Sequence, residues 1–308
     1  MGRYVQQRVL LMIPTIVLTS LVVFLMLHLI PGDPASIYLG ENQATPERLE
    51  QIREQLGLNR PLYVQFADFL FRAAQGDLGR SVQTNRPVIQ EIVDRLPNTV
   101  TLAVSAMVLA VLLGITLGAL AGLRQNTWLD TTLMLVALAG VSIPVFWLGL
   151  LLILFFAVQL GWLPATGEGG VRGLILPTIS LAALSTATLA RLVRASIIEV
   201  LGQDYVRTSR AKGLRQAAIV VRHALPNALI PVVTVIGLQF GNLLSGAVIT
   251  ESVFARAGLG KLVVDSILNK DFPMVQGVIL VLATIYVVVN LIVDLSYAFI
   301  DPRIRLQS

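Results

Sequence analysis

Residues 99–123 read TVTLAVSAMVLAVLLGITLGALAGL, a run of 25 residues without Asp, Glu, Lys or Arg. About 20 apolar residues are enough for a helix to cross the hydrocarbon core of a bilayer. The whole chain shares this composition, because 55% of its 308 residues are hydrophobic and only 13% are charged. The apolar runs are continuous and do not alternate with polar residues as the strands of membrane barrels do. We therefore expect an all-α polytopic membrane protein.

Further apolar runs lie on both sides of this stretch. Together they predict about six transmembrane helices, at residues 9–30, 99–123, 129–160, 175–192, 229–250 and 275–300. The first run follows a short basic leader, but it is longer than the apolar region of a secretory signal and no small-x-small cleavage site follows it, so we expect it to be retained. An even number of spans places both termini on one side.

The distribution of charge predicts which side that is. With both termini in the cytoplasm, the inward-facing segments hold twelve Lys and Arg residues against four Asp and Glu residues. The outward-facing segments carry a small acidic excess. Cytoplasmic loops of membrane proteins are enriched in Lys and Arg. We therefore expect cytoplasmic N- and C-termini.

Residues 31–96 are too polar to span the bilayer and are predicted to form a small helical extracytoplasmic insertion. Thr45 as N-cap with Pro46 at the first helical position predicts the start of one helix, and Gly57 predicts its end. A second helix is expected to begin after Pro61 and end at Gly76. The sequence shows no internal repeat and no interdomain linker. One membrane domain with an inserted segment is the simplest organisation.

The second polar segment, residues 191–226, faces inward in this topology and contains seven Lys and Arg residues but only two acids. Its part from residue 204 reads DYVRTSRAKGLRQAAIVVRHALP. Apolar residues recur there at intervals of three or four: Ala211, Leu214, Ala218 and Val221. That spacing predicts one face of a helix, and Leu225-Pro226 predict its end.

The periodicity alone leaves two interpretations of this predicted helix open. Small Ala211 and flexible Gly213 would let the surface of another protein approach closely. A basic amphipathic helix can equally lie on anionic lipid headgroups.

The same segment resembles the inner loop of permeases from ABC-type importers for dipeptides, oligopeptides and nickel. That loop carries Glu-Ala-Ala, three residues, Gly, nine residues, Ile, one residue and Leu-Pro. Gly213 and Leu225-Pro226 match this spacing. The remaining positions differ from it: Arg207, Thr208 and Ser209 replace Glu-Ala-Ala, and His223 replaces Ile.

Other segments extend the resemblance over nearly the whole chain. They are PGDP at 31–34, QLGL at 55–58, GDLGRS at 76–81, ESVF at 251–254, GLG at 258–260 and DPRIR at 301–305. Ala257 stands where the family commonly has Pro before Gly-Leu-Gly. The resemblance implies a type I ABC importer permease fold in which residues 1–308 form one transmembrane domain.

The resemblance also implies a division of labour in the cytoplasmic membrane of a bacterium. Its expected partners are a homologous second permease, two ATPase subunits that use ATP and Mg, and an extracytoplasmic substrate-binding protein. Residues 191–226 would be the coupling loop, with the ATPase-contacting positions Asp204, Arg207, Arg210, Ala211, Lys212, Gly213, Leu214, Leu225 and Pro226. The chain itself carries no P-loop, since the nearest stretch, residues 255–261, lacks the first Gly and the Ser or Thr after Lys. We expect no enzymatic activity and no cofactor in this chain.

Short peptides are the substrates that the resemblance implies, with nickel or another small solute as the alternative. An ion-coupled secondary transporter is the alternative from a different class. Such transporters more often bury several carboxylates or histidines, whereas Asp294 is essentially the one acid within the predicted spans, since Asp130 at the edge of the third span counts with the cytoplasmic segments. His28 and His223 fall on opposite membrane faces, so no metal site is expected.

Polar residues within the predicted fifth span are candidates for a translocation pathway. Four of them fall within an arc of about 80° at 100° per residue: Gln239, Asn242, Gly246 and Thr250. They could line a water-filled route or form hydrogen bonds between helices, and the sequence leaves both possibilities open.

Two further patterns concern packing and helix geometry. Gly114, Gly118 and Gly122 recur every fourth residue, which predicts close packing against another helix. Pro144 leaves the carbonyl of Gly140 without its helical donor, which predicts a kink in the third span.

Overall fold

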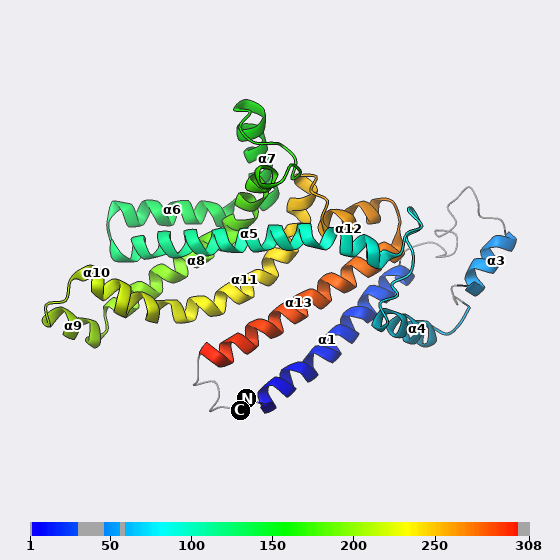
Figure 1. The fold of residues 1–308 in the computed structure, drawn as a ribbon, viewed down its shortest axis with the longest axis horizontal. Coiled ribbons are helices and arrows are strands. Elements are labelled where there is room, and N and C mark those ends of the chain that lie inside the picture. Colours follow the sequence, from blue (N-terminus) through cyan, green and yellow to red (C-terminus); the bar gives the residue numbers. More distant parts are fainter. Residues whose placement is uncertain (1, 30–45, 56–58, 301–308) are drawn as a thin grey trace. The chain divides into compact units, whose positions relative to one another are not determined.

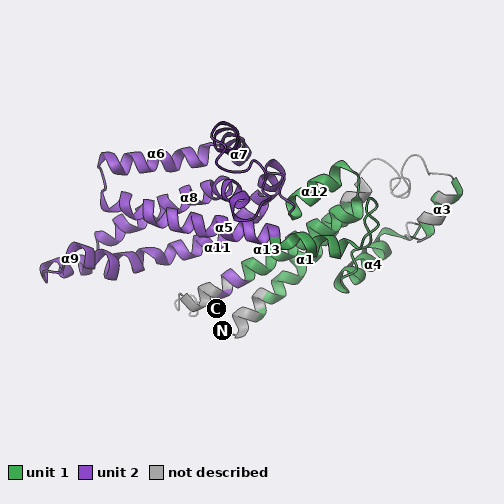
Figure 2. Cartoon of the chain, turned by 45° about the horizontal axis from the view of Figure 1, so that its top comes forward, with its two compact units in different colours: residues 1–97, 258–291 green, residues 98–257, 292–308 purple. Residues whose placement is uncertain are grey.

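The computed structural model describes residues 2–29, 46–55 and 59–300, and the regular elements in these residues are helices, apart from one isolated bridge between Arg80 and Pro87. Figure 1 shows the order of the helices along the chain. The chain divides into two compact units (Figure 2), each described here by itself. Unit 1 comprises Met1–Pro97 with Gly258–Leu291, and unit 2 comprises Asn98–Ala257 with Ile292–Ser308.

Unit 1 contains the N-terminal helices and the beginning of the last helix. Its elements are α1 (Gly2–Leu29), α3 (Pro46–Gln55), α4 (Leu62–Ala74), the first turns of α5 (Val88–Leu123), α12 (Leu259–Leu268) and most of α13 (Phe272–Ile300). α4 packs against α1. α13 approaches the start of α5 closely, because a Cβ on Gly277 would lie 2.4 Å from Cγ1 of Val88.

Unit 2 is built around α8 (Val171–Leu201). Its other elements are the rest of α5, α6 (Trp128–Ser142), α7 (Val145–Leu152), the π-helical turn η1 (Ile153–Gln159), α9 (Asp204–Ala211), α10 (Gln216–Ile219), the π-helical turn η2 (Val220–Ala224) and α11 (Leu225–Val253). α8 packs against α6, α7 and α11. Its residues Leu189, Val193 and Ile197 are fully buried in the core of this unit.

Four helical stretches in the described residues are long and apolar enough to cross a membrane: Val88–Leu123, Val171–Leu201, Gln216–Val253 and Phe272–Val293. The bent pair of α6 and α7 raises the number to five if it counts as one span. The first predicted span is present as α1, whose shorter apolar stretch is Val9–Leu25. The chain is therefore a multi-pass helical protein.

The third predicted span, residues 129–160, is wrong as a single helix. α6 and α7 are separate helices that meet at 105°. Ile143 adopts an extended backbone with φ −87° and ψ 122°, and Pro144 precedes the first residue of α7. A residue before proline is disfavoured in the helical region. The predicted kink at Pro144 is confirmed, and it is a complete break.

The break allows the two halves to pack on different helices. A Cβ on Gly140 in α6 would lie 3.2 Å from the carbonyl oxygen of Ala183 in α8. A Cβ on Gly149 in α7 would lie 3.1 Å from the ring of Phe254, just beyond α11. The glycines thus mark close contacts on both sides of the bend.

The prediction that Gly114, Gly118 and Gly122 serve packing is confirmed. A Cβ on Gly118 would lie 2.5 Å from the carbonyl oxygen of Ala190 in α8, and one on Gly114 would lie 2.6 Å from Cβ of Leu189. These distances are shorter than van der Waals contact, so α5 and α8 touch through their backbones.

The polar insertion contains the two helices predicted within it. α3 begins at Pro46, while Thr45 and Gly57 lie outside the described residues. α4 ends at Ala74, two residues before the predicted stop signal Gly76, which has φ +80°. α5 begins at Val88, so the last residues of the predicted insertion form the first turns of that helix, and the limit at residue 96 stays a prediction.

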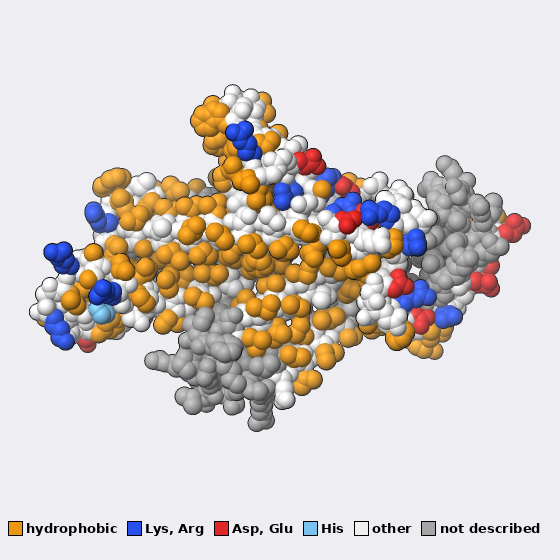
Figure 3. Space-filling model, viewed as in Figure 1, with side chains coloured by type: hydrophobic (Ala, Val, Ile, Leu, Met, Phe, Trp, Pro, Cys, Tyr) orange, Lys and Arg blue, Asp and Glu red, His pale blue; other side chains and the backbone are white. Residues whose placement is uncertain are grey.

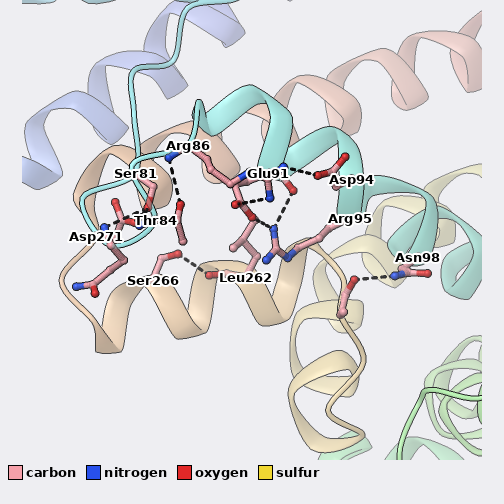
Figure 4. A network of polar contacts seen from close by, with 12 residues as sticks. Ser81, Thr84, Arg86, Glu91, Asp94, Arg95, Asn98, Leu262, Ser266 and Asp271 are labelled. Carbon is pink, nitrogen blue, oxygen red and sulfur yellow. Dashed lines mark hydrogen bonds and ion pairs between the residues drawn. The ribbon is translucent and has the colours of Figure 1, made fainter.

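Paired charges explain why the first turns of α5 looked like a polar loop. Arg86 lies 2.9 Å from both the buried Glu91 and the exposed Asp94, and Arg95 also pairs with Glu91. Figure 4 shows this network beside α12. Hydropathy counts these charges as polar whether or not they are paired in the fold.

Candidate coupling segment and translocation pathway

The segment between α8 and α11 is not the single helix predicted for residues 204–226. α9 ends at Ala211, residues 212–215 form a turn, and α10 continues through η2 into α11. Leu225-Pro226 therefore lie inside a continuous helical stretch, Gln216–Val253, where they were predicted to end a helix. The wider π-helical turn η2 comes directly before them.

Gly213 ends α9 through its backbone conformation. Its φ is +79°, a region that non-glycine residues rarely adopt. The N–H of Gly213 donates to the carbonyl of Arg210, and the N–H of Leu214 donates to the carbonyl of Ser209. This pair of bonds is a Schellman motif, in which glycine is the preferred residue. The space around its missing Cβ is open.

Buried anchors hold this segment in place. Val206 of α9 and Ile219 of α10 are both fully buried. Nδ2 of Asn227 in α11 donates to the hydroxyl of Tyr205 at 3.1 Å. α9 and α10 also contact each other. The segment is thus attached to unit 2 at several points.

The predicted coupling positions are on the outside of this anchored segment. Its exposed members are Asp204, Arg207, Arg210, Ala211, Lys212, Gly213, Leu214 and Pro226, and Leu225 is half-buried. Figure 3 shows Lys and Arg side chains gathered at the α9 and α10 end of the molecule. Leu214, 44% exposed, places an apolar side chain among them. We call the exposed residues from Asp204 to Leu214 the basic face.

An ion pair between α6 and α8 was missed by the sequence analysis. Nε and Nη2 of Arg194 donate to the two carboxylate oxygens of Asp130 at 2.6 and 2.8 Å. Asp130 also accepts the N–H of Asn126, and its own N–H donates to the N-cap residue Thr127. The Thr-x-x-Asp spacing at the start of a helix was the available signal, but it does not identify Arg194 as the partner.

The four candidate pathway residues do not share one environment. Gln239 and Thr250 are buried, Gly246 is half-buried and Asn242 is exposed. Nδ2 of Asn242 donates to Oε1 of Gln239 at 2.8 Å, and the Thr250 hydroxyl donates to the carbonyl of Gly246 at 3.1 Å. Both bonds lie within α11. A Cβ on Gly246 would meet Cδ1 of Leu181 at 2.9 Å, so this glycine lies against α8.

Arg256, just beyond α11, is a second feature that the sequence did not reveal. It is only 8% exposed. Its Nη1 donates to the carbonyl of Gly167 at 2.7 Å, and its Nε lies 3.4 Å from the carbonyl oxygen of Asn98. Gly167 in turn donates its N–H to the carbonyl of Phe254 at 2.6 Å. Burial lowers the pKa of Arg256, and the nearby Glu251 carboxylate raises it. Arg256 therefore joins three segments distant in sequence.

Unit 1 has a polar connection of its own. The Ser81 hydroxyl donates to Oδ2 of the buried Asp271 at 2.5 Å, and the N–H of Val82 donates to Oδ1 at 3.2 Å. Nε2 of Gln83 donates to the carbonyl of Asn269 at 3.0 Å. Figure 4 includes the Ser81–Asp271 bond. The loop that carries the GDLGRS stretch is thereby bonded to the residues that precede α13.

The described residues contain no group of three or more His, Cys, Asp and Glu residues that could hold a metal ion. His223 lies in η2, whereas the side chains of His28 and Asp294 lie outside the described part of the structure.

These features define a multi-pass helical membrane protein with a broken helix and an exposed basic segment between two long helices. Residues 114–306 match the family described as binding-protein-dependent transport system inner membrane component, and residues 1–103 match the N-terminal model of the same kind of transport system. The chain belongs to this family and is an inner-membrane permease of the ABC importer class.

Relatives match over almost their full length. The chain is 43% identical to a dipeptide transport system permease protein, DppB, of Alkalihalophilus pseudofirmus, with 98% of this chain and 99% of the relative covered. It is 45% identical to a glutathione transport system permease protein, GsiC, of Escherichia coli K12, with 99% of each chain covered.

Solved structures show the same fold at low sequence identity. The MetNI methionine ABC transporter in an inward-facing conformation matches with a TM-score of 0.57 and 20% identity, covering 69% of this chain and 97% of that one. An amino acid ABC transporter matches with a TM-score of 0.52 and 21% identity, covering 70% and 94%. The predicted type I ABC importer permease fold is confirmed.

Proposed function

We propose that this chain forms part of the channel through which an ATP-driven importer moves short peptides across the inner membrane. The observation that carries this proposal is the 43–46% identity, over 98–99% of the chain, to permeases named for dipeptide and glutathione transport. Glutathione is itself a tripeptide. Both names therefore favour substrates with peptide backbones over nickel or sugars.

The proposed assembly contains a homologous second permease, two ATPase subunits and an extracytoplasmic substrate-binding protein. The family description supports dependence on a binding protein. ATP hydrolysis, with its Mg, is assigned to the separate ATPases, and this chain needs no cofactor. The excess of Lys and Arg on the segments assigned to the cytoplasm supports cytoplasmic termini and an extracytoplasmic position for residues 31–96.

The basic face is the proposed contact with an ATPase. Its residues are exposed while Val206 and Ile219 beneath them are fully buried. A force that the ATPase exerts on this anchored segment would be transmitted to α8 and α11, which flank it. Four residues of α11 are proposed to line the pathway: Gln239, Asn242, Gly246 and Thr250. None of them carries a charge, which is compatible with passage of a peptide that is not held tightly.

Reconstituted uptake tests the substrate assignment. Proteoliposomes containing this chain, its companion permease and ATPases, and the binding protein should accumulate labelled dipeptide or glutathione when Mg-ATP is supplied. A non-hydrolysable ATP analogue is the control and should give no accumulation. Accumulation driven equally well by an ion gradient without ATP would contradict the proposal.

A separate experiment tests the coupling contact. Replacing Arg207, Arg210, Lys212 and Arg215 by Gln should reduce co-purification of the ATPase if the basic face binds protein. Replacing Arg60 and Arg72, which lie in or next to α4, by Gln provides a control that removes two positive charges from a different part of the chain. Loss of anionic-lipid binding with normal ATPase association would instead support a headgroup-binding segment.

A further inference from the structure

α4 has more apolar surface than its contact with α1 uses. Phe66 and Phe69 pack on Phe24 of α1, with ring centroids 5.5 and 6.0 Å apart. At 100° per residue, these two side chains lie on one side of the helix. A different side carries four further apolar residues within an arc of about 80°: Tyr63, Ala67, Phe71 and Ala74. We call this second side the free apolar face of α4.

The free apolar face is exposed in the structure. Tyr63 is 75% exposed and Phe71 is 67% exposed, and Ala67 and Ala74 are exposed as well. Figure 3 shows hydrophobic side chains along one edge of the region that α4 occupies, next to charged ones. α4 contains no buried residue. Such a face is stable only if something apolar covers it.

The polar residues of α4 form a narrow third stripe. Gln65, Asp68 and Arg72 fall within an arc of about 60°, which leaves more than half of the helix circumference apolar. The ion pair between Arg60 and Asp68, at 3.1 Å and exposed on both sides, lies on this stripe. A helix with this division of residues can lie in the plane of a membrane interface.

The position of α4 along α1 also points to a membrane interface as the surroundings of the free apolar face. The contact residue Phe24 lies five residues before the end of α1 at Leu29. At 1.5 Å per residue this is about 8 Å from the end of the helix, which matches the depth to which interfacial helices bury their apolar face. Val22 and Leu25 of α1 are also exposed there, at 54% and 36%, so the apolar surface of α1 continues towards α4. Tyrosine is enriched at this depth in membrane proteins.

We propose that α4 is an interfacial helix, whose Tyr63, Ala67, Phe71 and Ala74 rest in the headgroup and upper acyl region of the bilayer while Asp68 and Arg72 face water. The occupant of the free apolar face is thus lipid. This inference requires that the chain spans a membrane but does not depend on the transported substrate.

The absence of cysteine from the chain makes this inference directly testable. Single variants Ala67→Cys, on the free apolar face, and Arg72→Cys, on the polar stripe, are spin-labelled in the chain purified with its accompanying subunits and placed in lipid nanodiscs. Collision with oxygen reports lipid, and collision with a water-soluble nickel chelate reports solvent. The oxygen-to-nickel collision ratio should be severalfold higher at position 67 than at position 72.

Two outcomes would overturn the proposal. Equal ratios at both positions, with high nickel collision, would show that the free apolar face lies in water. Low collision with both reagents at position 67 would show that another protein covers it. Both positions are exposed and neither contributes to the contact with Phe24, so the labels leave the packing of α4 on α1 intact. Because no transport is measured, failure here is distinct from failure of the proposed function.

Discussion

Gly213 shows how one residue can have two separate reasons to be glycine. Its φ of +79° meets the needs of the Schellman motif that ends α9. In the proposed contact of the basic face with an ATPase, the missing side chain would also let the partner approach closely. Asparagine separates these reasons, because it tolerates the left-handed conformation but adds a side chain.

We therefore predict that Gly213→Asn leaves the fold intact yet lowers ATPase co-purification and ATP-driven uptake. Gly76→Asn is the matched control, since Gly76 ends α4 with the same pair of hydrogen bonds, φ +80° and open space around its Cβ. Substituting Gly76 should change neither measurement. If Gly213→Asn behaves like the control, glycine serves only the turn and the contact assignment fails.

Arg256 is predicted to hold the loop before α8 in place. Its guanidinium binds the carbonyl oxygens of Gly167 and Asn98 from a buried position. In Arg256→Met those acceptors lose a charged donor, which costs about 1.5–3 kcal/mol per bond. Hydrogen exchange at residues 161–170 should accelerate. Arg172→Met, at an exposed arginine in the first turn of α8, should leave exchange in this loop unchanged.

At the scale of elements, the contact between α5 and α8 depends on glycine more than the contact between α11 and α8 does. A Cβ on Gly118 would meet the carbonyl oxygen of Ala190 at 2.5 Å, and a backbone atom cannot rotate away. A Cβ on Gly246 would meet only Cδ1, at the end of the Leu181 side chain, at 2.9 Å and no backbone atom.

Gly118→Ala is accordingly expected to destabilise the protein by about 1–3 kcal/mol through overpacking, whereas Gly246→Ala should be nearly neutral. Thermal unfolding of both variants in the same detergent provides the measurement. An unfolding midpoint for Gly118→Ala as high as that of Gly246→Ala would mean that α5 and α8 can move apart with little loss of stability.

The ion pair between α6 and α8 makes a second prediction at this scale. The side chain of Asp130 is only 5% exposed and that of Arg194 is 29% exposed. Removing one member of a buried pair leaves a charge uncompensated and costs about 3–5 kcal/mol. Arg194→Met and Asp130→Asn should each lower the unfolding midpoint.

The double variant measures whether the two charges act together. It should lose much less stability than the sum of the single variants, because neither charge then remains buried alone. If the losses of stability simply add, Arg194 and Asp130 stabilise the fold through other partners. One such partner is Asn126, whose N–H donates to the Asp130 carboxylate.

For the molecule as a whole, we expect substrate selectivity to lie mainly in the binding protein. The proposed pathway residues carry no charge that could hold a peptide terminus: Gln239, Asn242, Gly246 and Thr250. Exchanging the binding protein for one of different specificity, with this permease unchanged, should therefore change the imported substrate. The uptake spectrum measured before and after the exchange provides the test. Selectivity that stays with the permease would show that this chain recognises the substrate itself.

The sequence determined the class of the molecule without help from tertiary structure. Long apolar runs must form helices in a bilayer because each backbone N–H and C=O then finds its partner within the same segment. The spacing of Gly213 and Leu225-Pro226 indicated the family together with other segments, such as GDLGRS at 76–81 and DPRIR at 301–305. Local rules also predicted the start of α3 at Pro46, the end of α4 just before Gly76 and the break at Pro144, since each depends on the backbone of a few consecutive residues.

Tertiary structure alone decided what depends on residues distant in sequence. Periodicity could not reveal that α9 ends at Ala211 and that a new helix, α10, begins at Gln216 and continues into α11, because the apolar spacing continues across the turn at Gly213. Hydropathy placed the start of α5 too late, since it cannot register that Glu91 is neutralised by Arg86 and Arg95. Asp130 with Arg194, and Arg256 with Gly167, meet only in the folded chain, where their separation in sequence gives no local pattern to recognise.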